Sequence, residues 1–275
     1  MPRPVITFTT DFGPAAPAVC RGVMYRIAPD ALIIDINHQV PRYSIRDGAG
    51  TLVFALPYMP IGVHVAVVDP GVGTERRAVA LKVARGDILV GPDNGLLLPA
   101  AERLGGVVAA HALDNRDLML PVVTNSFHGR DVFAPIAAHL AMGTPIEAVG
   151  RAIDPATLVH LEAPRPTIRV GELVSQIVQV LIFGNVTFAG TTADLQAAIG
   201  PLAPGHRVTL EFPAHDGRPA VTEATVWERT FGSVPLGASL LMEDSEGHLS
   251  FADNQGNAAE RLGLALDRPV RIRPT

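Results

Sequence analysis

Short, continuous apolar runs alternate with amphipathic stretches through the first half of the chain, and this alternation limits the possible folds more than any other feature. The runs occupy residues 5–8, 32–36, 62–68, 79–83 and 88–90. Apolar residues recur at helical spacing in the stretches 17–28, 44–56 and 131–142. A strand without polar alternation is buried on both faces, which is typical of a parallel sheet covered by helices on each side. The pattern therefore predicts an α/β domain with a largely parallel sheet.

Local signals predict where helices end and where the first domain stops. Ser44 is placed to cap the second helix, Pro57 to end it, and Gly143 to close the third. After Ala163-Pro164-Arg165-Pro166 the pattern changes to short alternating strands separated by glycines. We therefore expect an α/β domain over residues 1–163, a linker over 164–167 and a mostly β domain over 168–275.

Composition argues against several classes of function. The 275 residues are 48% hydrophobic and 18% charged, enough for a sizeable core in one large or two ordinary domains. The net charge is -5 without a basic run, so nucleic acid is not an expected partner. The uncharged stretches 48–68 and 173–193 contain prolines or polar residues, so neither is expected to span a membrane. A single cysteine, Cys20, and an amino terminus unlike a signal peptide predict a cytoplasmic location.

Three segments place charged or polar groups beside glycines at the end of an apolar run. They are Thr10-Asp11-Phe12-Gly13, Val67-Val68-Asp69-Pro70-Gly71-Val72-Gly73-Thr74-Glu75-Arg76-Arg77 and Asn125-Ser126-Phe127-His128-Gly129-Arg130-Asp131. Enzymes with α/β folds present polar groups in this way at the carboxyl edge of the sheet. The sequence therefore predicts a site at that edge.

Together with three further segments, these motifs resemble the signature of the S-adenosyl-L-methionine (SAM) hydrolase family, also called SAM hydroxide adenosyltransferases, which is related to fluorinating and chlorinating enzymes. The further segments are Pro92-Asp93-Asn94-Gly95-Leu96-Leu97, Phe183-Gly184-Asn185 and Asn254-Gln255-Gly256-Asn257-Ala258-Ala259. The resemblance implies a catalytic α/β domain, a small β-barrel domain, and hydrolysis of SAM to adenosine and methionine without a cofactor. It also implies a homotrimer, with sites between the large domain of one subunit and the small domain of its neighbour.

The expected reaction requires a stronger nucleophile than water. SAM carries a sulfonium, so methionine leaves C5′ without an acid catalyst, whereas hydroxide is scarce because the pKa of water is about 15.7. The resemblance assigns catalysis to Asp69, Arg76 and His128. Arg76 would stabilise the developing hydroxide, Asp69 would hold the guanidinium and could accept a proton, and His128 would position the water or relay its proton. The alternative is that residues 69–71 form only a strand-ending turn and that Arg76 lies on the surface.

Substrate-binding residues are expected in both domains. Asp11 suits a ribose diol, the role of its counterpart in the family, although an N-cap or Asx turn would use the same residue. Tyr43 aligns with an aromatic residue that contacts the ribose in the halogenating relatives, and it could equally serve packing. The candidates for contacts with adenine or methionine are Phe183, Asn185, Phe231, Asn254 and Ala258. Either phenylalanine could instead belong to the core.

Some features of the sequence leave the function open. No metal site is expected, because Asp69 and His128 have no third ligand at a telling spacing. Leu181 stands where members of the family usually have an acidic residue that binds the amino group of the substrate, and the stretch 14–18 looks short. Three functions therefore remain. The first is a SAM hydrolase, the second a catalytically weak protein that binds SAM or adenosine, and the third a halide-dependent SAM halogenase, which the charged set disfavours.

Overall fold

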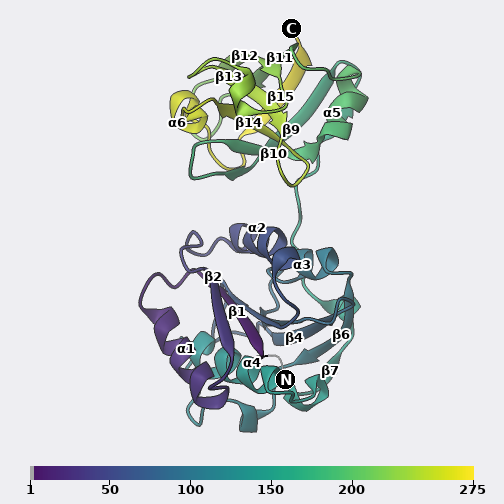
Figure 1. Cartoon of the computed structure of the whole chain (residues 1–275). Helices are drawn as coiled ribbons and strands as arrows, with labels where there is room; N and C mark the ends of the chain where they lie inside the picture. The colour runs from purple at the N-terminus through teal and green to yellow at the C-terminus, as the bar shows by residue number, and fades with distance from the viewer. Residues whose placement is uncertain (1–2) are drawn as a thin grey trace. The chain divides into compact units, whose positions relative to one another are not determined.

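The structure, a computed structural model, describes residues 3–275 and divides the chain into two compact units (Figure 1). Unit 1 ends at Leu161, and unit 2 spans Glu162–Thr275. Each unit has buried cores of its own. The predicted linker, 164–167, lies among the first residues of unit 2.

Unit 1 is built on a seven-stranded sheet with the order β2-β1-β3-β5-β4-β6-β7. Its strands are β1 (Val5–Thr10), β2 (Leu32–Asn37), β3 (Val63–Val67), β4 (Ala78–Val83), β5 (Ile88–Pro92), β6 (Val107–Ala112) and β7 (Ala152–Ile153). Strands β2, β1, β3 and β5 run parallel, whereas β4, β6 and β7 are added by antiparallel pairing. The predicted α/β class is confirmed, with the parallel pairing in the part of the sheet that contains β1 and β3.

The hairpin formed by β4 and β5 was not expected from the alternating pattern. Only residues 84–87 connect the two strands. A parallel crossover needs about a dozen residues or more. The short connection was therefore the sequence signal for antiparallel pairing.

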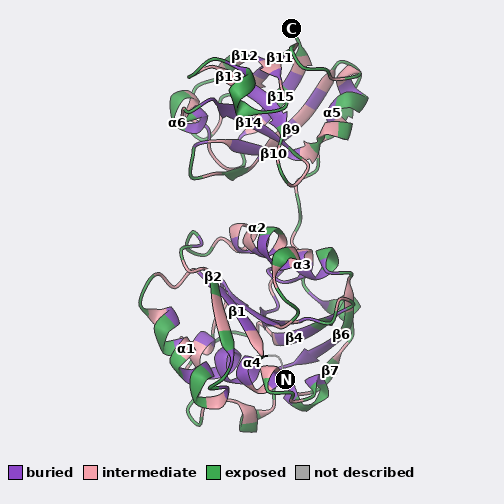
Figure 2. Ribbon diagram, in the orientation of Figure 1, coloured by how far each residue is buried: buried purple, intermediate pink, exposed green. Residues whose placement is uncertain are grey.

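Helices cover both faces of this sheet, as the buried residues in Figure 2 illustrate. They are α1 (Ala16–Ile27), α2 (Ile45–Ala55), α3 (Leu98–Arg103) and α4 (Ala134–Ala141), with short helical turns η1 (Leu56–Tyr58), η2 (Arg116–Leu118), η3 (Gly129–Phe133), η4 (Ile146–Val149) and η5 (Pro155–Thr157). One core packs α1 and α4 on the sheet around Phe8, Met24 and Phe133. The other packs α2 and α3 on the opposite face around Leu52 and Leu89. Burial on both faces explains why these strands lack polar alternation.

The predicted helix ends are found with one adjustment. The hydroxyl of Ser44 accepts the N–H of Asp47 and so caps α2. Pro57 lies inside the 3-10 turn η1, which continues the path of α2 for three residues. Gly143 follows α4 in a left-handed conformation with a φ of +95°. A π-helical turn, η3, precedes α4, and such turns are frequent at functional sites.

Unit 2 is a barrel of seven strands, with β8 paired outside it along β9. Its strands are β8 (Thr167–Arg169), β9 (Glu172–Val180), β10 (Val186–Thr191), β11 (His206–Phe212), β12 (Val221–Trp227), β13 (Ser239–Glu243), β14 (His248–Asp253) and β15 (Pro269–Pro274). The order is β10-β14-β13-β12-β11-β15-β9, and pairing of β10 with β9 closes the ring. Phe188, Phe212 and Phe251 fill the interior. The predicted β-barrel is confirmed.

Unit 2 also contains helical segments that the sequence pattern did not predict. They are α5 (Thr192–Ile199), α6 (Ala258–Leu262) and the 3-10 turn η6 (Phe231–Ser233). Thr191 and Asp194 form a capping box at the start of α5, which was an available sequence signal. Within residues 3–275, no helix combines the length and the apolar character needed to cross a membrane. The stretches 48–68 and 173–193 form helix-strand and strand-turn-strand segments, as predicted.

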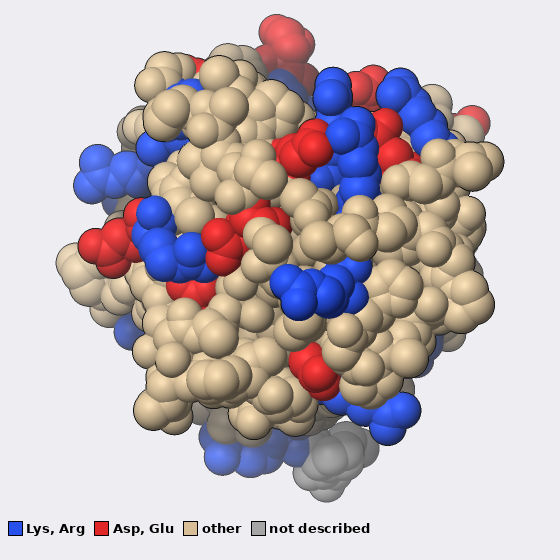
Figure 3. Space-filling model, turned by 90° about the horizontal axis from the view of Figure 1, so that it is seen from above, with Lys and Arg blue, Asp and Glu red and all other residues tan. Residues whose placement is uncertain are grey.

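Charges of opposite sign lie side by side on the molecule, as Figure 3 shows for one face. In unit 2, Arg261 binds Asp253 and Glu223 with N···O distances of 2.7 and 2.9 Å. Arg273 likewise binds two glutamates at 2.6 and 2.9 Å. The charges of Arg261 and Arg273 are therefore neutralised by neighbouring carboxylates.

Candidate active site

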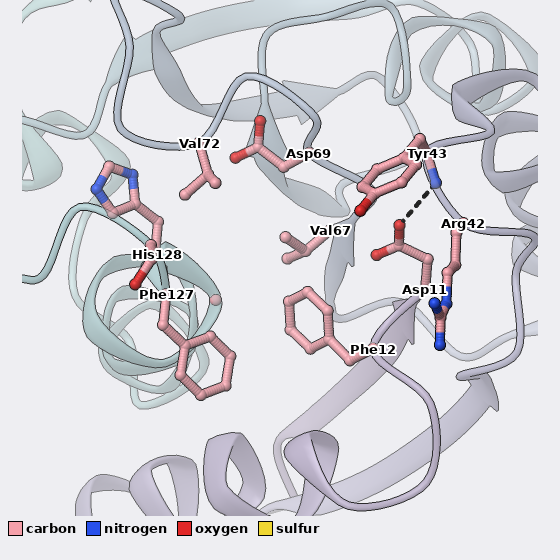
Figure 4. Close-up of a pocket in the computed structure, with 11 residues that line it drawn as sticks. Asp11, Phe12, Arg42, Tyr43, Val67, Asp69, Val72, Phe127 and His128 are labelled. Carbon is pink, nitrogen blue, oxygen red and sulfur yellow. Dashed lines mark hydrogen bonds between the residues drawn. The ribbon is translucent and has the colours of Figure 1, made fainter.

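The ends of β1 and β3 and the residues around His128 enclose a cavity of about 330 Å³ in unit 1 (Figure 4). Its walls contain Asp11, Phe12, Arg42, Tyr43, Val67, Asp69, Val72, Ser126, Phe127, His128 and Gly129. Because β1 and β3 are parallel neighbours, Asp11 and Asp69 lie at the same edge of the sheet. The three segments that the sequence placed at one edge therefore meet in one cavity.

Asp69 and Arg76 form a bidentate ion pair across the turn 69–76. Arg76 donates from Nε to Oδ1 at 3.1 Å and from Nη2 to Oδ2 at 2.5 Å. The side chains are only 3% and 8% exposed, respectively, and the guanidinium also lies over the ring of Phe133. Charges removed from water in this way need a close, aligned partner. The side chain of Arg76 is thus almost inaccessible to solvent and does not lie free on the surface.

His128 lies directly against Arg76, with Nδ1 3.3 Å from Nη2. A guanidinium only donates hydrogen bonds, so Nδ1 accepts and the proton of the neutral ring is assigned to Nε2. Burial lowers the pKa of His128, and the charge of Arg76 lowers it further, against the opposing effect of Asp69. The imidazole is therefore neutral at pH 7, with Nε2–H as its donor.

Arg76 is not part of the cavity wall, which Asp69 and His128 form. Its Nη1 is buried and has no hydrogen-bond partner among the residues that the structure describes. A buried donor without a partner costs on the order of 1–3 kcal/mol. Arg76 therefore acts on the cavity through Asp69 and His128.

Close backbone packing holds the turn that carries Arg76 against the segment that carries His128. Gly73 has a φ of +76°, and a Cβ at this position would lie 2.2 Å from the carbonyl oxygen of Asn125. Glycine alone satisfies both the conformation and the space. The contact between Arg76 and His128 thus depends on a glycine three residues before Arg76.

A second set of contacts, centred on Asp131, fixes the loop before His128. The carboxylate of Asp131 accepts the N–H and the hydroxyl of Thr124 at 2.8 and 2.6 Å, and Nε of Arg130 at 2.5 Å. Burial acts to raise the pKa of Asp131, but hydrogen bonds from Arg130 and Thr124 outweigh it and lower the pKa. The ionised carboxylate therefore holds residues 124–131 in place.

Asp11 faces the cavity from the end of β1, with Tyr43 beside it (Figure 4). Its Oδ2 accepts the N–H of Tyr43 at 3.0 Å. Tyr43 has a φ of 65°, an uncommon conformation for a residue with a side chain, and its ring is largely exposed. Helix α1 has Ala15 as its N-cap, so Asp11 does not cap it. The carboxylate instead fixes the strained backbone of Tyr43 at the rim of the cavity.

Seven residues of the cavity wall were not identified as site residues from the sequence. They are Phe12, Arg42, Val67, Val72, Ser126, Phe127 and Gly129. Phe12 and Phe127 meet edge to face with ring centroids 5.5 Å apart and form an apolar wall (Figure 4). A Cβ on Gly129 would lie 2.7 Å from the ring of Phe12, so the glycine permits this packing. Phe12 and Phe127 lie in the motifs of Asp11 and His128, and this position was the sequence signal that could have identified them. No such signal marks Arg42.

In unit 2, the barrel brings two of the expected segments together. The N–H of Ala259 donates to the carbonyl oxygen of Gly184 at 2.9 Å. A Cβ on Gly184 would lie 1.9 Å from Oδ1 of Asn257, so the two loops pack without space for a side chain. The loop at 183–185 and the segment 254–259 therefore form one surface.

The five candidate residues of unit 2 differ in exposure. Phe183 is 76% exposed, Phe231 is 40% exposed and Asn185 is partly exposed. Asn254 and Ala258 are buried, and Asn254 donates its side-chain amide to a backbone carbonyl at 2.7 Å. The two phenylalanines are thus outside the core, whereas the side chains of Asn254 and Ala258 shape the segment in which they lie.

Comparison with known proteins agrees with this geometry. Residues 6–150 match the model of the SAM hydroxide adenosyltransferase N-terminal domain, and residues 176–271 match that of the C-terminal domain. The chain belongs to the SAM hydroxide adenosyltransferase family. A relative from Salinispora tropica, named (R)-S-adenosyl-L-methionine hydrolase, is 44% identical over 273 residues, which cover 98% of each chain.

Two further matches are less similar to this chain in sequence. A fluorinase from an Actinoplanes species is 29% identical, with 98% of this chain and 97% of the fluorinase covered. The crystal structure of an uncharacterized conserved protein from Thermotoga maritima matches with a TM-score of 0.86 and 32% identity, covering 97% and 99% of the two chains. The named hydrolase is thus markedly more similar to this chain than the fluorinase is.

Leu181, where the resemblance led us to expect an acidic residue, lies just after β9. Its N–H donates to the carbonyl oxygen of Asn185, and its own carbonyl accepts the N–H of Gly184, both at 2.8 Å. The leucine thus begins the tight turn between β9 and β10. Over the described part of the chain, no three His, Cys, Asp or Glu side chains gather as metal ligands.

Proposed function

We propose that this protein hydrolyses SAM to adenosine and L-methionine by attack of activated water on C5′. The observation that carries the proposal is the hydrogen-bonded, partly buried set of Asp69, Arg76 and His128 at a cavity that Asp11 also faces. A set suited to activating water thus shares a cavity with a carboxylate suited to a ribose diol. The identity of 44% with a protein named (R)-S-adenosyl-L-methionine hydrolase supports hydrolysis over halogenation.

The proposed reaction balances with water as the second substrate. The water oxygen forms a bond to C5′ while the C5′–S bond breaks, and the electron pair of that bond leaves with sulfur as the neutral thioether of methionine. Water loses one proton, so the products are adenosine, methionine and H⁺. Attack by an oxygen with hydroxide character on a sulfonium cancels opposite charges, which is favoured where water is excluded.

The geometry supports a distinct task for each of Asp69, Arg76 and His128. Asp69 takes the proton of water, because each carboxylate oxygen keeps a second acceptor site beside its bond to Arg76. Arg76 stabilises the negative charge as it develops. His128 orients the attacking oxygen through Nε2–H, since its Nδ1 already accepts from Arg76. His128 thus positions the water and leaves proton removal to Asp69.

Substrate binding is divided between the two units in this proposal. Asp11 binds the 2′- and 3′-hydroxyls of the ribose, and Tyr43 packs against the sugar. The residues proposed to contact adenine or methionine are Phe183, Asn185, Phe231, Asn254 and Ala258. The exposure of Phe183 and Phe231 supports their part, whereas Asn254 and Ala258 would act through the backbone of their segment.

We also propose that the protein is a homotrimer in which the barrel of one subunit completes the cavity of its neighbour. Large apolar side chains that are more than half exposed on both units support this assembly. They include Tyr43, Phe54 and Tyr58 in unit 1, and Ile182, Phe183 and Leu236 in unit 2. Such side chains are normally covered when they form a patch.

A cytoplasmic location fits the single cysteine of the chain. Cys20 is free and buried in the core of unit 1. Burial raises the pKa of Cys20 to about 12, so its thiol is unreactive. The protein therefore needs no oxidising compartment for its fold.

The test is incubation of the purified protein with SAM in both configurations at sulfur, followed by chromatography of the products. We expect adenosine and methionine to form without added halide, and the rate to be insensitive to EDTA. Chloride and fluoride should give no 5′-halogenated adenosine. Tight adenosine binding without turnover, even at high protein concentration, would contradict hydrolysis and favour a binding protein, the alternative that Leu181 keeps open.

A further inference from the structure

Behind the turn that carries Asp11 lies a set of hydrogen bonds that the proposed reaction does not use. Oγ1 of Thr10 is hydrogen-bonded to Nδ1 of His38 at 2.9 Å and accepts the N–H of Phe12 at 3.2 Å. The backbone carbonyl of His38 accepts the N–H of Gly13 at 2.9 Å. His38 therefore holds the turn twice, once through its main chain and once through its ring.

The ring of His38 is held from its other sides as well. It meets the ring of Phe8 edge to face, with centroids 4.9 Å apart. Its Nε2 lies 3.0 Å from Oδ1 of Asp35, an ion-pair distance without the alignment of a hydrogen bond, and Asp35 also pairs with Arg21. The side chain is 13% exposed. The ring cannot turn away from Thr10 without losing these contacts.

We propose that His38 is a positioning residue that fixes the turn presenting Asp11 to the substrate, acting through the hydroxyl of Thr10. This inference rests on the proposed function, in which Asp11 binds the ribose. His38 and Thr10 do not line the cavity, so their influence reaches a ligand only through the turn. If the turn moves among several positions, the carboxylate of Asp11 is correctly placed for binding only part of the time. The apparent affinity for the ligand falls in proportion to that fraction. The groups around Asp69 stay in place, so KM changes more than kcat.

Two substitutions break the link with little change in shape. His38→Phe keeps the ring that packs on Phe8 and removes Nδ1, whereas Thr10→Val removes only the hydroxyl. Each should raise the KM for SAM and the Kd for adenosine by about fivefold, the effect of one ordinary hydrogen bond, with kcat nearly unchanged. The double variant should bind no more weakly than either single variant, because both changes break the same link. His38→Asn keeps an amide near the position of Nδ1 and should restore most of the affinity.

Thr7 supplies a matched control from the same strand. Its Oγ1 is hydrogen-bonded to Nδ1 of His64 at 2.9 Å. Nε2 of His64 is in turn hydrogen-bonded to Oδ1 of Asp87, so this set of contacts does not include the turn 11–13. Thr7→Val should therefore lower stability and leave KM unchanged. The proposal is overturned if His38→Phe has the KM of the parent, or if Thr7→Val raises KM as much.

Amide hydrogen exchange separates this proposal from the proposed function. In His38→Phe, the N–H of Phe12 should exchange faster, whereas the N–H of Gly13, which is bound to the main chain of residue 38, should stay protected. If the parent forms no adenosine from SAM, hydrolysis fails as the function, and exchange still decides the role of His38. Unchanged protection of the Phe12 N–H would show that the ring does not hold the turn.

Discussion

Arg76 controls both of the groups that line the cavity next to it. It binds the two carboxylate oxygens of Asp69 and lies against Nδ1 of His128. The same cation therefore compensates a buried negative charge and helps to keep the imidazole neutral. Loss of this single side chain should disturb the ionisation and the orientation of the whole set.

Arg76→Ala should lower kcat by about 10²-fold or more, with a smaller effect on KM, because the lost stabilisation belongs to the transition state. Steady-state SAM hydrolysis measures both constants. Arg77→Ala is the matched control, since Arg77 pairs with Asp93 at 2.6 Å and does not line the cavity. It should lose stability and keep its turnover. A normal kcat in folded Arg76→Ala would remove Arg76 from the mechanism.

Turnover should fall at acid pH as His128 becomes protonated. Protonation places Nδ1–H against the guanidinium of Arg76 and removes the acceptor that orients the ring. Because the pKa of His128 is lowered, turnover should be retained below the ordinary histidine pKa of roughly 6.5 and be lost only as pH falls through the lowered value. Between the lowered pKa and roughly 6.5, the unfolded chain binds more protons than the folded chain. The free energy of unfolding therefore also decreases as the pH falls through this range.

Titration of the histidines by NMR tests the cause of this shift. Arg76→Met should raise the pKa of His128, because the charge of the guanidinium is removed. His139 is the internal control, since burial alone lowers its pKa. Equal movement of both histidines would indicate a general loosening of the fold, and no movement of His128 would rule out the effect of Arg76.

At the scale of elements, the contact between Arg76 and His128 depends on how the turn 69–76 packs against the segment that contains Asn125. Gly73→Ala should move the turn 69–76 away from Asn125, because the new Cβ would lie 2.2 Å from a carbonyl oxygen. We expect a clear loss of kcat, together with roughly 1–2 kcal/mol of stability lost to the positive φ. Gly143→Ala is the control, since its φ is +95° but its surroundings are open. It should lose similar stability while its hydrolysis rate stays that of the parent.

Helices and strands with a local sequence signal could be predicted, whereas features that depend on contacts with distant parts of the chain were harder to predict. The strands β1, β2 and β3 and the cap at Ser44 follow from apolar runs and from a hydroxyl at a helix start. The run at 79–83 was expected as a strand, but its antiparallel pairing, which the short connection to β5 indicates, was not expected. The short α6 was missed because it forms where the chain packs against the barrel. Tertiary contacts override local pattern at such positions.

The features of the candidate site likewise differ in whether they could be predicted from the sequence. Asp11, Asp69 and His128 could be placed near one another because each follows an apolar run or lies in a motif beside one. Two contacts could not be inferred from the sequence. The contact of Arg76 with His128, which assigns the ring proton to Nε2, joins residues 52 positions apart. The hydrogen bond of His38 to Thr10, beside the turn of Asp11, joins residues 28 positions apart. Sequence spacing identifies which groups are available, and only the fold shows which atoms face each other.

At the scale of the whole molecule, the proposed substrate contacts come from two units that each have a core of their own. Unit 1 contains the charged set and Asp11, while unit 2 contributes the surface formed by residues 183–185 and 254–259. Neither unit contains all of the proposed contacts. The proposed trimer gives the exposed apolar side chains of both units a partner, and its disruption should therefore affect assembly and catalysis together.

Ile182→Glu tests this connection between assembly and activity. Ile182 is 92% exposed in the turn between β9 and β10, so a glutamate there should leave the barrel folded. At an apolar subunit interface, however, an unpaired carboxylate is strongly unfavourable, so the trimer should dissociate and SAM hydrolysis should fall with it. Val170→Glu is the matched control, because Val170 is fully exposed at the opposite end of β9. Sedimentation and initial rates measured on the same samples decide the outcome. An Ile182→Glu variant that stays trimeric and fully active would place the interface elsewhere, and a fully active monomer would show that a neighbouring barrel is not needed.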